Sequence, residues 1–168
     1  MGVRVKTTKN EFPDTQRVTK ALNGKKVIVG CLEGEHAWLA SIHEYGCKIP
    51  VTDKMRAFLH YKGIHLKPTT TVITIPERSF IRAGHDEYAD GVLKSAERAL
   101  PDVLAGTMDE DTYCRMVGEM LASKIKKYAI DLKDPPNSGW TTDWKGSSNP
   151  LVDTGSLVGG ITYEVQDE

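Results

Sequence analysis

The sequence predicts an α+β fold, with about four strands in a mixed or antiparallel sheet packed by two long helices. Runs of β-branched residues are separated by amphipathic stretches, and two long stretches of helical period fill residues 85–132. The chain has 168 residues, of which 39% are hydrophobic and 27% charged. This length and composition suit one ordinary core, so we expect a single domain over residues 1–168.

The first part of the chain is expected to hold short elements. Residues 1–11 are polar and lack periodicity, which predicts a flexible N-terminal arm. A short helix over residues 13–22 and a strand over residues 25–30 should follow. Residues 36–45 predict a helix with one apolar stripe. The stripe consists of Trp38, Leu39, Ile42 and Tyr45.

The middle of the chain predicts one clear strand and both long helices. Residues 52–61 fit a short helix or an insertion between strands, and residues 69–75 are a β-branched run bounded by prolines. The first long helix is expected over residues 85–104, with Pro101 kinking or splitting it. The second should begin at residue 107 with a capping box and end near residue 132.

The end of the chain predicts a long loop and a last strand. Residues 134–150 are rich in Pro, Asn, Ser, Gly and Trp, and a loop of this length is usually functional or mobile. Residues 161–165 alternate apolar and polar side chains, which is typical of a strand.

Charge is distributed unevenly between the two halves. The first 82 residues hold 14 lysines and arginines against 7 acidic residues, and the remainder holds 8 against 16. Halves of opposite net charge suit a protein that packs against copies of itself or against an adjoining ring. A polarised but merely solvated surface is the simpler alternative.

Several kinds of site and location are disfavoured by the sequence. No stretch is long and apolar enough for a membrane span, so a soluble protein made in the cytoplasm is expected. Three widely spaced cysteines predict free thiols. Glycine-rich phosphate loops are absent, and we expect no cofactor. Four residues could be drawn together as metal ligands, but their spacing does not fit a zinc site, so no metal is expected. They are Cys31, His36, His43 and Cys47.

The sharpest enzymatic signal is Asp153-Thr154-Gly155, because aspartic proteases present a catalytic carboxylate on this tripeptide. One such motif per chain would require a symmetric dimer in which two aspartates share a proton. Too few residues follow Asp153 for a flap and the closing strands. We therefore expect Asp153 or Thr154 to cap a turn before the last strand, with Gly155 relieving the backbone.

Three segments of the chain occur in a fixed order. The first is Val27-Ile28-Val29-Gly30 followed by Leu39-Ala40-Ser41-Ile42-His43-Glu44-Tyr45-Gly46, and the second is Ile75-Pro76-Glu77-Arg78-Ser79-Phe80-Ile81-Arg82. The third is Pro135-Pro136-Asn137-Ser138, then Thr141 and Lys145-Gly146, then Pro150-Leu151-Val152-Asp153-Thr154-Gly155-Ser156-Leu157. Together these segments resemble the virion-morphogenesis family of tailed bacteriophages, also called tail-completion, head–tail joining or minor tail proteins. The resemblance spans residues 16–166, and residues 47–67 depart from it as an insertion.

The resemblance implies a non-enzymatic structural protein of the virion that assembles in the host cytoplasm. It would act as a homo-oligomeric ring at the head-proximal end of the tail, expected to be a hexamer to match tail symmetry. Its partners would be copies of itself, the tail tube protein and the neck or head-completion proteins, and DNA would pass through its lumen.

Candidate contact residues fall in two places. Glu77, Arg78 and Arg82 surround Phe80 directly after a strand, which suits a ring contact of arginine forks and an apolar anchor. The alternative is that they pair within the chain around a buried Phe80. The second place is residues 134–150 and the adjoining motif. Its candidates are Trp140, Trp144, Lys145 and Asp153.

Two other functions are kept open. A head-side neck adaptor or stopper would contact the portal and DNA, and its basic half would then line the lumen and bind in a salt-sensitive way. A dimeric aspartic protease using Asp153 is the more remote reading, and it would lose cleavage on Asp153→Asn.

Overall fold

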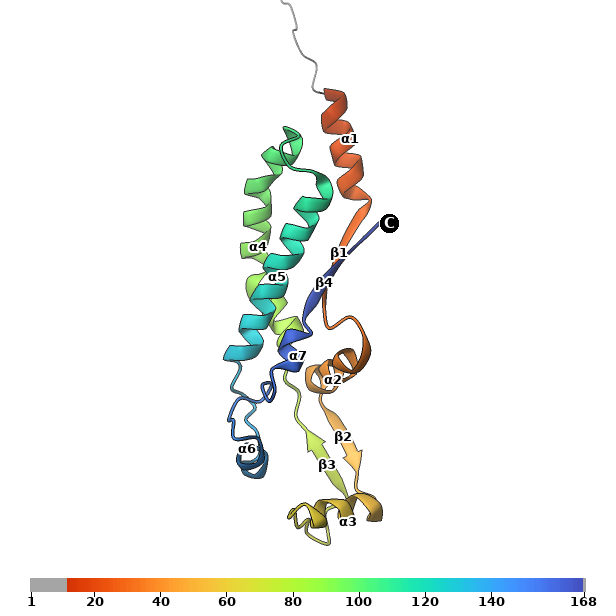
Figure 1. Ribbon diagram of the computed structural model, residues 1–168, viewed down its shortest axis with the longest axis vertical. Coiled ribbons are helices and arrows are strands. Elements are labelled where there is room, and N and C mark those ends of the chain that lie inside the picture. Colours follow the sequence, from red (N-terminus) through yellow and green to blue (C-terminus); the bar gives the residue numbers. More distant parts are fainter. Residues whose placement is uncertain (1–11, 168) are drawn as a thin grey trace, which may run out of the picture.

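The computed structural model describes residues 12–167, which form an elongated molecule (Figure 1). Its long axis runs from α1 at one end to α3 at the other. The elements in chain order are α1 (Phe12–Asn23), β1 (Lys25–Gly30), α2 (Gly34–Tyr45), β2 (Cys47–Pro50), α3 (Asp53–Tyr61), β3 (Val72–Ile75), α4 (Phe80–Leu104), α5 (Glu110–Asp131), α6 (Gly139–Lys145), α7 (Ser156–Gly159) and β4 (Thr162–Asp167).

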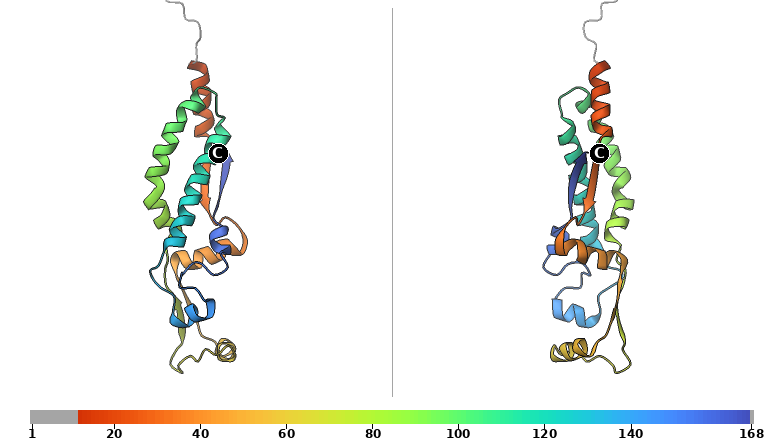
Figure 2. Two further views of the ribbon diagram at one scale, coloured as in Figure 1. Left: turned by 60° about the vertical axis from the view of Figure 1, so that its left-hand side comes forward. Right: turned by 90° about the vertical axis from the view of Figure 1, so that its right-hand side faces the viewer.

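The body of the molecule is layered. Strands β1 and β4 pair antiparallel, and one face of this ribbon packs on α5 while α4 packs on α5 (Figures 1 and 2). Val27 pairs with Val165 and Val29 with Tyr163, and these side chains are half-buried, whereas Glu164, which lies between Tyr163 and Val165, is exposed. The alternation of strand residues therefore gives the ribbon one inner and one outer face.

Mixed helix and strand content and the two long helices confirm the predicted fold class. The number of strands, four, agrees with the prediction, and they are antiparallel, but β2 was not predicted, and the strands form two separate two-stranded sheets, β1 with β4 and β2 with β3. Helix α2 lies between the two pairs and leads the chain away from the body, so β2 and β3 do not reach the edge of the first pair (Figure 1).

Two predicted helix limits need correction. Helix α4 begins at Phe80 rather than at residue 85, and Pro101 lies near its C-terminal end without splitting it. Helix α5 begins at Glu110, and its N-cap is Asp109, whose carboxylate accepts a hydrogen bond of 2.8 Å from the backbone N–H of Thr112. Sequence periodicity marks the apolar face of a helix more clearly than its ends.

The segment 134–150 is not a plain loop, because it contains helix α6. The hydroxyl of Ser138 accepts from the backbone N–H of Thr141, and Gly146 closes the helix with a φ of 66°.

The predicted N-terminal arm, residues 1–11, lies outside the described residues. Residues 47–67 supply β2 and α3, so the departure from the family motifs is itself structured.

The buried core joins the C-terminal half of α5 to the segment before β4. Helix α2 and the first turn of α4 complete it. The molecule is therefore held together near its middle, where the chain segments of the three motifs meet. The core residues are Ala40, Phe80, Ala122, Ile125, Ala129, Leu151, Leu157, Val158 and Ile161.

Candidate functional site

Glu44 joins the first motif segment to the second. Its side chain lies at the end of α2 and is only 3% exposed. The carboxylate accepts hydrogen bonds of 2.9 Å from the backbone N–H groups of Ile81 and Arg82, and one of 2.9 Å from the hydroxyl of Ser79. The first N–H groups of a helix have no partner inside the helix and carry partial positive charge. Glu44 thus caps α4 from another helix, which explains why α4 begins at Phe80.

Arg82 adds a charged partner to this cap. Its Nε donates to the Glu44 carboxylate over 3.0 Å, and its Nη2 donates to Glu77 over 2.7 Å. The guanidinium also lies over the ring of Tyr45, 4.8 Å from the centroid. Glu77 and Arg82 remain about half exposed, so they keep a surface position next to the buried cap.

Arg78 joins the second motif segment to the third. It is 4% exposed, and its guanidinium donates to the backbone carbonyls of Pro135 and Pro136 over 2.8 and 3.0 Å. A further hydrogen bond of 3.4 Å reaches the side chain of Asn137. A buried arginine needs several acceptors, and these carbonyls provide them. Arg78 therefore fixes the start of segment 134–150 against the body.

The predicted ring contact through Arg78 and Phe80 is wrong. Both side chains are buried within the chain, and Phe80 is completely inaccessible. Phe80 follows a strand and packs into the core, and its charged neighbours pair with Glu44 and the Pro135 segment instead. Of this cluster only Glu77 and Arg82 are available to a partner.

Gly46 completes the junction at the end of α2. Its φ is 70°, and a Cβ there would lie 2.9 Å from the backbone nitrogen of Glu77 and 3.0 Å from the carbonyl oxygen of Ile75. Only glycine satisfies both the backbone conformation and this close approach. Glu44, Gly46, Arg78 and Phe80 thus have structural roles in one place, which we call the motif junction.

No family model, curated protein or solved structure matches the chain. The relationship to the virion-morphogenesis proteins remains a prediction that rests on the motifs. What the structure adds is the contact between them.

A cavity of about 290 Å³ with both polar and apolar lining opens beside the motif junction. His43 and Lys145 line it, together with Asn137 and Asp153. The Nδ1 atom of His43 is buried and has no hydrogen-bond partner in the described structure. Burial first, and then the positive charges of Arg78 and Lys145, lowers the pKa of His43 to about 4. The ring is therefore neutral at pH 7.

The candidate contact residues of segment 134–150 differ in exposure. Trp140 and Trp144 stack on one side of α6 with ring centroids 5.8 Å apart, and Trp144 is 70% exposed. Lys145 is half-buried and donates to the carbonyl of Asn149 over 3.3 Å. Asp153 is exposed. The tryptophan pair is thus the apolar surface expected of a contact site.

The tripeptide Asp153-Thr154-Gly155 forms a turn. Thr154 accepts a hydrogen bond of 3.3 Å at its hydroxyl from the backbone N–H of Ser156, and Gly155 has a φ of 83°. The segment leads into α7 rather than lying on a strand. The turn with Gly155 agrees with the expectation from the sequence, but it is followed by α7 before the last strand, and the N-cap of α7 is Gly155, which has no side-chain cap.

Four exposed aromatic residues were missed as surface candidates. In α2, Trp38 and Tyr45 point outward, and the buried side chains of that helix are Ala40 and Glu44 instead. Half of the predicted apolar stripe is therefore wrong: Leu39 and Ile42 are half-buried, and Leu39 packs against the core, but Trp38 and Tyr45 are exposed. A buried, paired glutamate is not visible in the sequence as a core position. Phe58 and Tyr61 are exposed on α3. Trp38 and Tyr45 lie two helical turns apart, so helical spacing alone places both on one face of α2 and could have indicated an aromatic surface there.

The remaining features of residues 12–167 concern the thiols, possible metal ligands and apolar character of the helices. All three cysteines are free, and burial raises the pKa of the Cys31 and Cys114 thiols. Among residues 12–167, no three His, Cys, Asp or Glu side chains are grouped to hold a metal ion. Within the same range no helix is long and apolar enough to cross a membrane.

Proposed function

We propose that the protein is a structural virion protein of a tailed bacteriophage that completes the tail and joins it to the head. It works as a homo-oligomeric ring at the head-proximal end of the tail. The observation that carries this proposal is the motif junction. There, Glu44 of the first motif segment binds the second segment, and Arg78 of the second segment binds the third. Chance matches scattered along a chain have no reason to bind one another, whereas motifs of one fold do.

The exposed aromatic side chains support a protein whose work is association. Trp140, Trp144 and Trp38 are large and exposed, and such side chains dominate the binding energy of protein interfaces. They lie on α2 and α6, on the same half of the molecule as α3 (Figure 1). The partners of this half are neighbouring copies, the tail tube protein and the neck proteins.

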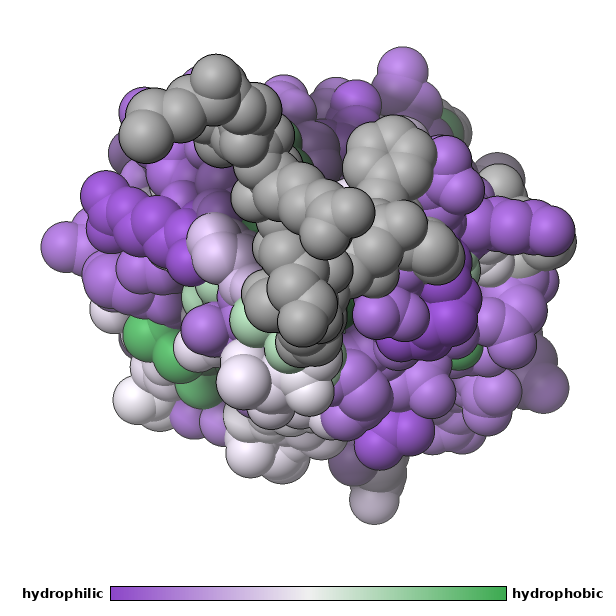
Figure 3. Space-filling model, turned by 90° about the horizontal axis from the view of Figure 1, so that it is seen from above, coloured by the Kyte–Doolittle hydropathy of each residue, from purple (hydrophilic) through white to green (hydrophobic). Residues whose placement is uncertain are grey.

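Ring assembly is consistent with an elongated protomer that has different chemistry at its two ends. Contacts between unlike surfaces of identical subunits close into a ring when the rotation between neighbours is a simple fraction of a turn. The end that carries α1 is mainly hydrophilic on its visible surface (Figure 3), whereas the opposite half has the exposed aromatic residues. A hexamer would match the symmetry of the tail.

An amber mutation in the gene tests the proposal. Infection of a non-suppressing host should yield DNA-filled heads and separate, headless tails of incomplete or variable length, seen by negative-stain electron microscopy. A suppressing host should restore whole virions, which controls for effects on neighbouring genes. Normal virions without the protein would refute the proposal.

A head-side neck adaptor is the second candidate, and the lysines around α3 favour it. Lys48, Lys54, Lys62 and Lys67 are all exposed, and they would suit contact with DNA phosphates in a lumen. The same mutant distinguishes the two functions. Loss of an adaptor should leave empty heads that have released their DNA beside complete tails.

A further inference from the structure

Residues 47–75 form a projecting hairpin, made of β2, α3 and β3, that stands away from the body (Figures 1 and 2). Every side chain in this segment keeps partial or full exposure. Its strands pair with each other, and α3 makes no extensive packing with any other described helix or strand. A two-stranded unit of this kind is marginally stable by itself, so packing of its exposed apolar side chains on another surface would stabilise it.

The projecting hairpin nevertheless has a defined internal geometry. Arg56 donates three hydrogen bonds to backbone carbonyls, at 3.4 Å to Leu66, 3.0 Å to Lys67 and 2.7 Å to Thr70. Thr52 caps α3 through the backbone N–H of Met55. The segment is thus held in one shape and presents a fixed surface.

That surface is a cationic aromatic stripe on α3, formed by Lys54, Phe58, Tyr61 and Lys62. Helical spacing places all four on one face. Phe58 is 58% exposed and Tyr61 is 83% exposed, and the Lys62 ammonium lies 5.8 Å from the centroid of each ring. The whole hairpin holds five lysines and arginines against one aspartate. A suitable partner surface is therefore apolar in its centre and acidic at its margins.

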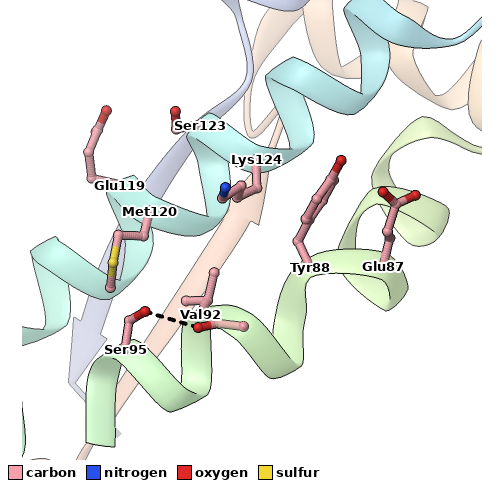
Figure 4. Close-up of a pocket in the computed structure, with 9 residues that line it drawn as sticks. Glu87, Tyr88, Val92, Ser95, Glu119, Met120, Ser123 and Lys124 are labelled. Carbon is pink, nitrogen blue, oxygen red and sulfur yellow. Dashed lines mark hydrogen bonds between the residues drawn. The ribbon is translucent and has the colours of Figure 1, made fainter. Parts of the chain in front are cut away.

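The body of the same chain offers such a surface between α4 and α5, a groove of about 480 Å³ (Figure 4). Val92 and Met120 form its apolar floor, and Glu87 and Glu119 stand at its margins. Its one lysine, Lys124, is placed over the ring of Tyr88, 5.5 Å from the centroid.

We infer that the cationic aromatic stripe of one copy docks in the α4–α5 groove of a second copy. Phe58 and Tyr61 cover the apolar floor, while Lys54 and Lys62 meet Glu87 and Glu119. The contact joins unlike surfaces, and repeating it closes a ring when the rotation between neighbours is a simple fraction of a turn. This inference rests on the proposed ring function and names its subunit contact. Apolar side chains such as Met55 and Leu59 on α3 favour a protein partner over nucleic acid, because phosphates offer them nothing to pack on.

Complementary charge reversal tests the contact in the full chain. Sedimentation velocity over a wide protein concentration range measures association of the wild type and of the variants. Reversing the hairpin (Lys54→Glu with Lys62→Glu), or the groove (Glu87→Lys with Glu119→Lys), should weaken association by about tenfold or more. Combining the four substitutions should restore much of the loss. Phe58→Ser with Tyr61→Ser should weaken it about 30-fold, as for hot-spot residues.

Cysteine crosslinking gives a second readout that does not depend on affinity. Tyr61→Cys with Ser123→Cys should give a ladder of disulfide-linked oligomers under mild oxidation. Tyr61→Cys with Glu164→Cys, which places the second thiol on the outer face of β4, is the matched control and should give none. Variants that carry only one of the added cysteines control for crosslinks through the three native thiols.

Each contrary outcome has a distinct meaning. Rings that persist in the reversed variants, without a ladder from the chain that carries Tyr61→Cys and Ser123→Cys, would overturn this contact and leave the ring function standing. Hairpin variants that assemble normally but lose retention on DNA would overturn it in favour of nucleic acid as the partner. A wild type that shows neither association nor a ladder also overturns it, and tail completion is then judged by the amber mutant alone.

Discussion

Glu44 shows how one charged side chain decides where a long helix begins. Its carboxylate is buried and serves two backbone N–H groups, one hydroxyl and one guanidinium. The favourable field at a helix N-terminus and the charge of Arg82 offset the cost of removing the carboxylate from water. Removing its charge should therefore destabilise the fold at the motif junction.

Glu44→Gln is expected to lower the free energy of unfolding by about 2 to 4 kcal/mol, because the amide presents a donor where donors already converge. Glu77→Gln is the matched control, since Glu77 also binds Arg82 but is exposed, and it should cost less than about 1 kcal/mol. Urea unfolding followed by circular dichroism measures both. Equal losses would contradict the capping role of Glu44.

His43 should make the fold sensitive to mild acid. Its pKa is about 4 in the folded protein and 6.5 in the absence of the fold, so between these values the unfolded chain binds the proton more readily. Stability is thus fully present above pH 6.5 and is lost as the pH falls toward 4. The loss should be about 1 to 2 kcal/mol, because solvent still reaches part of the ring.

Urea unfolding at pH 7 and pH 5 measures this loss, and His43→Asn is the comparison. The variant retains every acidic group. The difference between the two proteins in the free energy of unfolding lost from pH 7 to pH 5 therefore isolates the contribution of His43. Parallel slopes in both proteins would mean that His43 does not contribute.

At the scale of elements, two helical glycines have opposite surroundings. A Cβ at Gly118 in α5 would lie 2.5 Å from the Tyr163 ring on β4, whereas one at Gly91 in α4 would meet nothing within 4 Å. Gly118→Ala should destabilise by about 1 to 3 kcal/mol through overpacking, and Gly91→Ala should stabilise by about 0.5 to 1 kcal/mol through helix propensity. Thermal unfolding measured by calorimetry gives both signs. Stabilisation by both substitutions would mean that α5 does not approach the ribbon this closely.

Segment 134–150 is expected to depend on Arg78 for its position. Arg78→Lys keeps the charge but cannot reach two carbonyls and an amide at once. Limited proteolysis should therefore cut residues 134–150 at least about fivefold faster in the variant, since local opening exposes a segment to protease. Arg82→Lys is the control, because Arg82 makes no hydrogen bond to that segment in the described structure. Unchanged cutting would show that α6 is held by other contacts.

For the whole molecule, the tryptophan pair on α6 separates association from stability. The pair lies outside the contact between the α3 stripe and the α4–α5 groove, and we expect it to form a second subunit contact. Trp144→Ala should therefore weaken self-association by about 30-fold, yet it should change stability by less than about 1 kcal/mol because the ring is largely exposed. Light scattering and urea unfolding measure the two effects. Trp38→Ala, on α2, shows whether the contact extends beyond α6. Association that is unchanged in both variants would remove the tryptophans from the interface.

The sequence by itself determined the fold class, the two long helices and the positions of the main strands. Hydrophobic periodicity and β-branched runs are local signals, and each records which face of an element is apolar. The strand at residues 25–30 and the turn at Thr154 and Gly155 were predictable for this reason. The motif residues were also visible in the sequence, but not their roles.

The tertiary structure alone decided what those residues do. Arg78 and Phe80 read as a surface cluster, but their partners lie far along the chain, at Pro135 and in the core, and no local pattern encodes such contacts. The same is true of the division of four strands into two sheets, which depends on α2 lying between them. Whether Glu44 is buried or Trp38 exposed likewise depends on which segments pack on α2. Local periodicity determines elements, whereas burial and pairing depend on contacts between distant segments.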